Sequence, residues 1–144
     1  MSLEKLLKDR KIEKIERNEE LAKKTFALAL RDIAVAKKNL EDGNYDWTLA
    51  IAYNAMLQAG RALMFSKGYR PAGEYKHVGV LEFLREVFSG ELANKMIDTF
   101  NRLRKKRHRV VYEETDITSE SEAKNAIRFA EEFVNEVKTI LNIT

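Results

Sequence analysis

The chain of 144 residues contains no cysteine and one proline, and 34% of its residues are charged, with a formal net charge of +3. This length fits one domain with its own core, and the lack of cysteine excludes disulfides and thiolate metal sites. We find no apolar run long enough for a signal peptide or a membrane span. We therefore expect a cytoplasmic protein, and the abundance of Lys, Glu and Arg is compatible with heat adaptation.

The start of the chain differs in composition from the rest. Residues 1–17 are highly charged, with isolated apolar positions, and are compatible with either a docking helix or a frayed arm. We separate them from a helical bundle over residues 18–144. From about Asn18, apolar residues recur at steps of three and four until a turn at residues 42–44. This spacing predicts the first long helix.

The second long helix is expected to occupy the centre of the fold. Asp46 is placed to cap it, and residues 47–65 are apolar on nearly all sides, as in an element that packs against several neighbours. The polar exceptions, Asn54, Gln58 and Arg61, are four and three residues apart and share one stripe. Such a stripe fits a partly exposed edge, and it also fits a polar seam that faces a groove or a second subunit.

The middle of the chain contains the one extended loop that we expect, at residues 68–73. His77 follows this loop at the start of a short helix, where capping or hydrogen bonding is the first interpretation. A further helix is expected from about Glu91, and its apolar stripe, continued by one turn, reaches Arg107. An arginine on a buried helix face must be paired, hydrated or functional, because an unpaired buried guanidinium is costly.

The last helix has the clearest boundary in the sequence. Ser119 and Glu122 fit a capping box, and apolar residues then alternate at steps of four and three up to Leu141, as in a bundle helix. No run of alternating β-branched residues indicates a sheet. The sequence therefore predicts an all-α fold.

Positive charge is concentrated between residues 102 and 109. We call this segment the basic collar, and it comprises Arg102, Arg104, Lys105, Lys106, Arg107, His108 and Arg109. Such a collar can hold phosphates by Coulomb attraction and by the forked hydrogen bonds of arginine. The alternative is a solvated face that the acidic residues downstream balance. Because Arg107 shares its helix face with Phe100 and Leu103, we favour the functional interpretation.

Conventional catalytic motifs are missing from the sequence. We find no glycine-rich phosphate loop, no metal-ligand spacing and no recognisable nucleophile. We expect no cofactor and no metal. His77 and His108 are the only side chains whose ordinary pKa suits proton transfer near neutrality.

Four pieces of the sequence, in this order, resemble small prokaryotic proteins of the HEPN family: AYNAMLQAGRALMFSKGYRP, KHVGVLEFLREVF, RKKRHRVVYEE and ITSESEAKNAIRFAEEF. The resemblance spans about residues 20–141. It implies an up-and-down helical bundle of four to five helices, here with a short N-terminal helix, and usually a homodimer. It also implies a minimal nucleotidyltransferase as partner in a toxin–antitoxin pair, with RNA or a nucleotide as ligand. The lack of long apolar runs already argues against a membrane as partner.

Many members of this family are metal-independent ribonucleases. Their motif is an arginine, four to six residues and a histidine, contributed by both subunits; the arginine stabilises the phosphate while the histidine activates the ribose hydroxyl. In the register set by the flanking helices, Arg107 matches the arginine and Tyr112 takes the place of the histidine. Val111 stands where this branch often has an aspartate. Since a tyrosine, with a pKa of about 10, is a poor base at neutral pH, a binding component is the leading hypothesis.

Two other hypotheses remain open. Arg102 and His108 have five residues between them and match the ribonuclease spacing literally. The second hypothesis is therefore an active ribonuclease toxin. The third hypothesis is a non-catalytic structural adaptor whose basic collar pairs with an acidic partner. His77 matches a histidine common in this branch, and we treat it as an accessory residue together with Asn54, Gln58 and Arg61.

Overall fold

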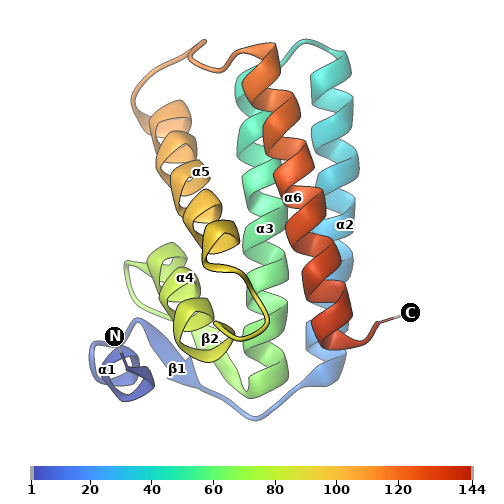
Figure 1. Ribbon diagram of the computed structural model, residues 1–144. Coiled ribbons are helices and arrows are strands. Elements are labelled where there is room, and N and C mark those ends of the chain that lie inside the picture. Colours follow the sequence, from blue (N-terminus) through green and yellow to red (C-terminus); the bar gives the residue numbers. More distant parts are fainter. Residues whose placement is uncertain (1, 144) are drawn as a thin grey trace.

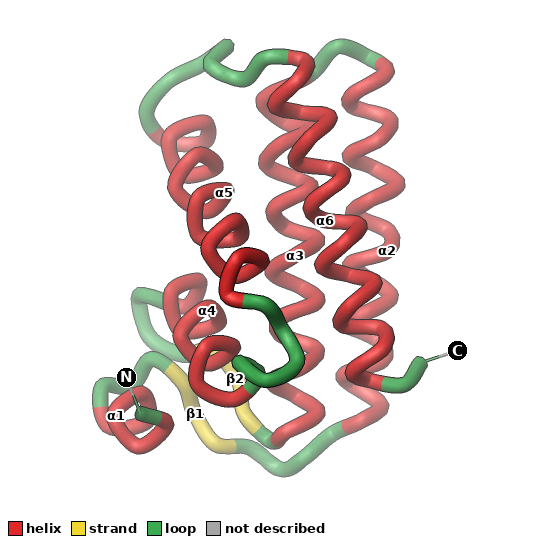
Figure 2. Tube along the Cα trace, viewed as in Figure 1, coloured by secondary structure: helices red, strands yellow, loops and turns green. Residues whose placement is uncertain are grey.

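The computed structural model describes residues 2–143, and in that range the chain forms six helices and one two-stranded sheet (Figures 1 and 2). The long helices are α2 (Glu19–Glu41), α3 (Tyr45–Lys67), α5 (Asn94–Tyr112) and α6 (Glu120–Leu141). The shorter elements are α1 (Leu3–Lys8), β1 (Ile12–Lys14), β2 (Tyr69–Pro71) and α4 (Lys76–Val87). The long helices alternate in direction, and the shorter elements gather at one end (Figure 1). The prediction of an all-α bundle is confirmed.

Helix α3 lies at the centre of the bundle, as its nearly uniform apolar surface predicts. It packs against α2, α4, α5 and α6. Tyr53 of α3 is fully buried and meets the edge of Phe100 from α5, with 5.5 Å between the ring centroids. Phe100 in turn meets Phe133 of α6 at 5.3 Å. These edge-to-face contacts, each worth about 0.5–1.5 kcal/mol beyond burial, fix α5 against the other helices.

The predicted capping box at the start of α6 is confirmed. The backbone N–H of Glu122 donates to Ser119 Oγ at 3.0 Å, and the N–H of Ser119 donates to Glu122 Oε1 at 3.1 Å. The fifth helix begins three residues later than expected, at Asn94 in place of Glu91. The intervening residues continue the turn after α4, in which the N–H of Leu92 donates to the carbonyl of Phe88 at 2.7 Å.

The prediction that Asp46 caps α3 is wrong. Asn44 precedes the first residue of α3, and the Asp46 carboxylate accepts the backbone N–H groups of Asp116 at 2.6 Å and Thr118 at 3.1 Å. Both N–H groups belong to the connection between α5 and α6. Two donors that converge on one carboxylate satisfy it better than a single helix N–H does. Asp46 therefore holds this connection over the start of α3.

The sheet was not predicted. Residues 68–73, expected as a loop, contain β2, which pairs antiparallel with β1 so that Ile12 lies opposite Pro71. Each strand has three residues, which is too short for a pattern of alternating side chains to be recognised. The pairing joins the N-terminal segment to the end of α3.

The N-terminal segment docks on its own chain. Leu6 and Ile12 are buried in the core, and Lys11 Nζ lies 3.3 Å from Glu82 Oε1 of α4. Gly79 of α4 permits this approach, because a Cβ at this position would lie 2.5 Å from the carbonyl oxygen of Lys11. Within residues 2–143 no helix is both long and apolar enough to cross a membrane.

The close approach at Gly79 gives a test of this packing. We expect Gly79→Ala to lower the free energy of unfolding by about 1–3 kcal/mol, because the added methyl group displaces the backbone near Lys11. Urea denaturation measures this change. Gly90→Ala is the matched control, since a Cβ there meets no atom within 4 Å. Equal stability of the two variants would contradict the docked arrangement.

Candidate nucleic-acid interface

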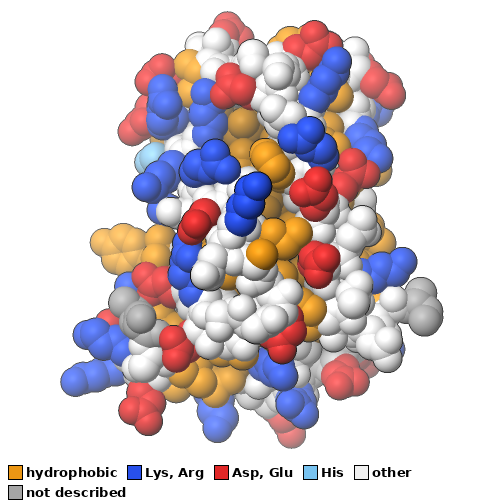
Figure 3. All heavy atoms as spheres, viewed as in Figure 1, with side chains coloured by type: hydrophobic (Ala, Val, Ile, Leu, Met, Phe, Trp, Pro, Cys, Tyr) orange, Lys and Arg blue, Asp and Glu red, His pale blue; other side chains and the backbone are white. Residues whose placement is uncertain are grey.

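The basic collar lies entirely on α5, and Figure 3 shows Lys and Arg side chains gathered over this helix. A helix turns once in about 3.6 residues, so the collar spans roughly two turns and its side chains point in several directions. Their surroundings consequently differ. Among residues 2–143, no three His, Asp or Glu side chains gather as metal ligands would.

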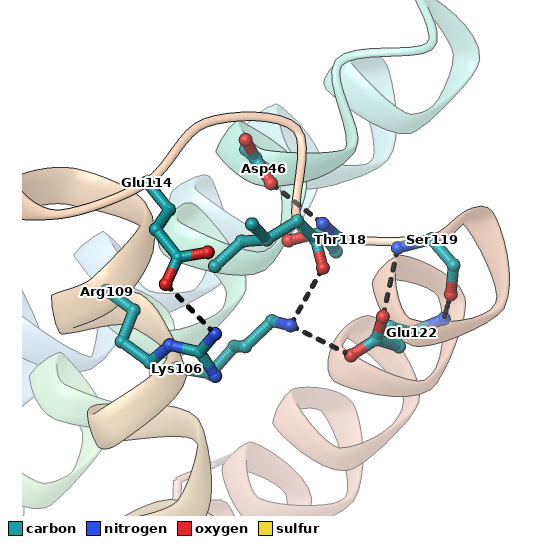
Figure 4. A network of polar contacts seen from close by, with 8 residues as sticks. Asp46, Lys106, Arg109, Glu114, Thr118, Ser119 and Glu122 are labelled. Carbon is teal, nitrogen blue, oxygen red and sulfur yellow. Dashed lines mark hydrogen bonds and ion pairs between the residues drawn. The ribbon is translucent and has the colours of Figure 1, made fainter.

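Two members of the collar are paired with carboxylates near the α5–α6 connection (Figure 4). Lys106 Nζ donates to the carbonyl of Ile117 at 2.8 Å and lies 3.3 Å from Glu122 Oε2. Arg109 Nη2 lies 3.3 Å from Glu114 Oε1. The pKa of Glu122 is lowered, first by the N–H of Ser119 and further by Lys106. Lys106 and Arg109 therefore stabilise the fold locally.

Adjacent lysines in the collar provide a direct comparison. We expect Lys106→Ala to lower the free energy of unfolding by about 1 kcal/mol, because its bond to Ile117 and its contact with Glu122 are lost. Lys105→Ala, on the exposed side of α5, should change stability by less than about 0.5 kcal/mol. Thermal or urea denaturation of both variants measures the difference. Equal losses would show that Lys106 does not hold the connection.

The alternative register consists of Arg102 and His108, which have separate partners on α5. Arg102 Nη2 donates to Thr99 Oγ1 at 3.0 Å. The ring of His108 packs on Tyr112, with centroids 5.0 Å apart. Arg102 and His108 therefore face different surroundings.

Arg107 and Tyr112 are brought together. The Arg107 guanidinium carbon lies 6.0 Å from the centroid of the Tyr112 ring and 6.0 Å from that of the buried Tyr53 ring. These are cation–π distances. Arg107 is half-buried, so the continuation of the apolar stripe places it against the bundle. Arg104, one turn earlier on the same side, donates from Nε to Asn101 Oδ1 at 3.0 Å.

A hydrogen bond between Tyr53 and His77 forms the inner part of the site. Tyr53 Oη lies 2.9 Å from His77 Nδ1. Burial raises the pKa of Tyr53, so the phenol keeps its proton. Because His77 Nδ1 is the partner of this buried hydroxyl among the described residues, we assign the phenol as the donor and place the imidazole proton on Nε2. The sequence interpretation missed Tyr53 because a tyrosine in an apolar helix is typical of a core. The signal that could have identified Tyr53 is its hydroxyl, because a buried hydroxyl requires a hydrogen-bond partner.

The charges of three arginines act on this pair. The pKa of His77 is lowered, mainly by burial and further by Arg107, Arg104 and Arg61. Arg61 is half-buried on α3, which lowers its pKa, and its Nη1 donates to Gln58 Oε1 at 2.8 Å. His77 is therefore neutral at pH 7 in a positive environment.

The polar stripe on α3 divides into two parts. Asn54 Nδ2 donates to Asp32 Oδ2 of α2 at 3.0 Å, and burial raises the pKa of this carboxyl. Gln58 and Arg61 bond to each other and remain partly exposed. Asn54 thus belongs to the contact between α2 and α3, whereas Arg61 lines the groove that also contains His77.

The titration of His77 tests these surroundings. We expect its imidazole, followed by NMR, to titrate below pH 6.5, and Arg107→Ala to raise this pKa because a nearby positive charge is removed. His108→Ala assigns the two histidine signals. Since the folded protein binds this proton less readily than the unfolded chain, His77 should weaken stability as the pH falls below 6.5. An unchanged pKa in Arg107→Ala would place Arg107 away from His77.

Comparisons with known proteins identify the family to which this fold belongs. The model of the HEPN domain matches residues 22–140, most of the chain. The protein belongs to the HEPN family, and the resemblance seen in the four sequence pieces is confirmed. Over 119 residues the chain is 30% identical to a protein of Methanocaldococcus jannaschii named "Putative toxin", and the match covers 79% of this chain and 84% of that protein.

Proposed function

We propose that this protein is a dimeric RNA- or nucleotide-binding component of a HEPN and minimal nucleotidyltransferase pair of the toxin–antitoxin type. The observation that carries this proposal is the placement of Arg107 between two aromatic rings, with no carboxylate partner among residues 2–143. An arginine held in this way presents its N–H fork to a phosphate with less loss of side-chain freedom.

The charges of α5 support the binding of a phosphate backbone. Arg102, Arg104, Lys105 and Arg107 have no carboxylate within salt-bridge distance in the described chain, whereas Lys106 and Arg109 do. The binding surface that we propose is therefore narrower than the whole collar. Contacts of this kind fix the position of a nucleic acid without reading its bases.

The residue at the motif position favours binding over cleavage. Tyr112 is 67% exposed and carries a phenol where many family members have an imidazole. A phenol can donate a hydrogen bond to phosphate but is a poor proton acceptor at neutral pH. A ribonuclease toxin remains the second candidate, because Arg107 and Tyr112 are in contact and the Methanocaldococcus jannaschii relative is named a toxin.

Exposed aromatic residues support the proposed dimer. Trp47 at the start of α3 is 58% exposed, and Tyr112 lies at the end of α5, which is the same end of the bundle (Figure 1). Aromatic side chains are enriched in protein interfaces. A second copy, or the nucleotidyltransferase, would cover them.

The test is incubation of the purified protein with cellular RNA in excess EDTA, followed by a filter-retention assay. We expect no cleavage, and we expect Arg107→Ala to weaken RNA retention about tenfold, since a charge-assisted bond is lost. Arg85→Ala is the control, because Arg85 on α4 already pairs with Asp98 at 2.7 Å and should leave retention unchanged.

Other outcomes separate the competing functions. Cleavage that Arg107→Ala abolishes and His108→Ala preserves would establish a metal-independent ribonuclease in the Arg107 and Tyr112 register. Loss of cleavage in His108→Ala would support the Arg102 and His108 register. If the protein neither cleaves nor retains RNA, the structural adaptor remains as the function that fits.

A further inference from the structure

A pocket of about 460 Å³ lies at the end of the bundle where α2 leads to α3 and α5 leads to α6. Its lining comes from two segments far apart in the sequence, which Figure 1 shows at the same end of the molecule. The start of α3 contributes Tyr45, Asp46 and Trp47, and the α5–α6 connection contributes Thr115, Asp116 and Thr118. Among residues 2–143, no Lys or Arg lines this pocket. Its charge is therefore opposite to that of the basic collar.

The aromatic part of the pocket is Trp47, the only tryptophan of the chain, which is 58% exposed. Tryptophan is the side chain whose ring attracts a cation most strongly. It is also enriched among the residues that contribute most to the affinity of protein interfaces. A tryptophan ring and two carboxylates that line one pocket attract the same kind of group, which is a cation with a flat face.

The two carboxylates of the pocket have different roles. Asp46 accepts the backbone N–H groups of Asp116 and Thr118 and holds the connection over the start of α3. The side chain of Asp116 is exposed, and no Lys or Arg of residues 2–143 lies within salt-bridge distance of it. Asp116 has a φ of +54°, and the bond from its N–H to Asp46 fixes its backbone there. The Asp116 carboxylate is therefore held in place before a ligand arrives, which favours binding.

Thr118 provides an independent sign of a ligand at this pocket. Its side chain is 8% exposed, and its hydroxyl has no hydrogen-bond partner among the described residues. Buried polar groups are usually hydrogen-bonded, because an unpaired hydroxyl in a buried position is unfavourable. A ligand with several N–H groups offers partners to both the Asp116 carboxylate and this hydroxyl.

These features favour a guanidinium over an ammonium group. A guanidinium is planar and stacks on an aromatic ring, and its five N–H groups point in several directions. An ammonium is compact and more strongly hydrated, so it gains less from an exposed ring. Among side chains, arginine is enriched in protein interfaces and lysine is depleted. The chemistry of the pocket thus matches an arginine presented by another protein.

We propose that this pocket receives an arginine side chain of a partner protein, with the guanidinium between the Trp47 ring and the Asp116 carboxylate. The inference goes beyond the proposed function, because it concerns a protein contact and does not depend on RNA binding. It assigns a specific chemistry to the partner that covers Trp47.

The test is a fluorescence titration of the full-length protein, in which Trp47 is the only tryptophan. The probe is a capped pentapeptide with arginine at its second and fourth positions and glycine elsewhere. In the control peptide, citrulline replaces both arginines, because it has nearly the same shape and no charge. We expect a saturable change in Trp47 emission with the arginine peptide and about tenfold weaker binding of the citrulline peptide.

Three variants locate the binding. Asp116→Asn should weaken binding of the arginine peptide about fivefold, because a charge-assisted contact is lost, and asparagine also tolerates a positive φ. Glu86→Gln removes the same charge from an exposed position on α4, at the other end of the bundle (Figure 1), and should bind normally. Trp47→Leu, followed by calorimetry, should weaken binding about threefold through loss of the cation–π contact.

Several results would overturn this inference. They are the lack of a saturable change with millimolar arginine peptide, equal binding of the citrulline peptide, or equal weakening in Asp116→Asn and Glu86→Gln. The last result would show a response to net charge alone. If dilution of the protein by itself changes Trp47 emission and the arginine peptide dissociates a dimer, the pocket receives a second copy and no separate partner. RNA retention should not fall in Asp116→Asn, which separates this inference from the proposed function.

Discussion

The buried hydroxyl of Tyr53 is the constraint around which the site is organised. A phenol with no exposed surface requires a hydrogen-bond partner, because an unsatisfied buried hydroxyl is unfavourable. His77 satisfies it and thereby ties the start of α4 to the middle of α3. The ring of Tyr53 also supports Phe100 and Arg107 of α5. One side chain of the central helix thus positions residues of both neighbouring helices.

The basic collar shows that residues adjacent in sequence can have different roles. Lys106 faces α6 and fastens the α5–α6 connection through Ile117 and Glu122, together with Asp46 from α3. Arg107, the next residue, faces α3 and lies on two aromatic rings. A step of about 100° around the helix axis is enough to exchange a carboxylate neighbour for an aromatic one. The charge available to a ligand is therefore smaller than the number of basic residues implies.

Family membership and the residues of this chain answer different questions. The HEPN match over residues 22–140 establishes the fold and the ancestry of the chain, but activity depends on the groups present at the site. In the register set by the flanking helices the motif position would hold Tyr112, while the imidazole whose pKa Arg107, Arg104 and Arg61 lower is that of His77, from another helix. Among residues 2–143, Arg61, Arg104 and Arg107 lack a carboxylate partner, and the proposed recognition of phosphate rests on this feature.

Features that depend on local spacing could be predicted from the sequence. The helical class, the central position of α3, the Ser119 capping box and the half-buried placement of Arg107 all follow from helical periodicity, which is a local property. The folded structure was needed to show the pairing of β1 with β2, the role of Asp46, the pairing of Tyr53 with His77 and the partner of each basic side chain. The reason is physical: these contacts join residues far apart in the chain, such as Asp46 and Thr118 at a separation of 72, and no local pattern encodes which distant surface a side chain will meet.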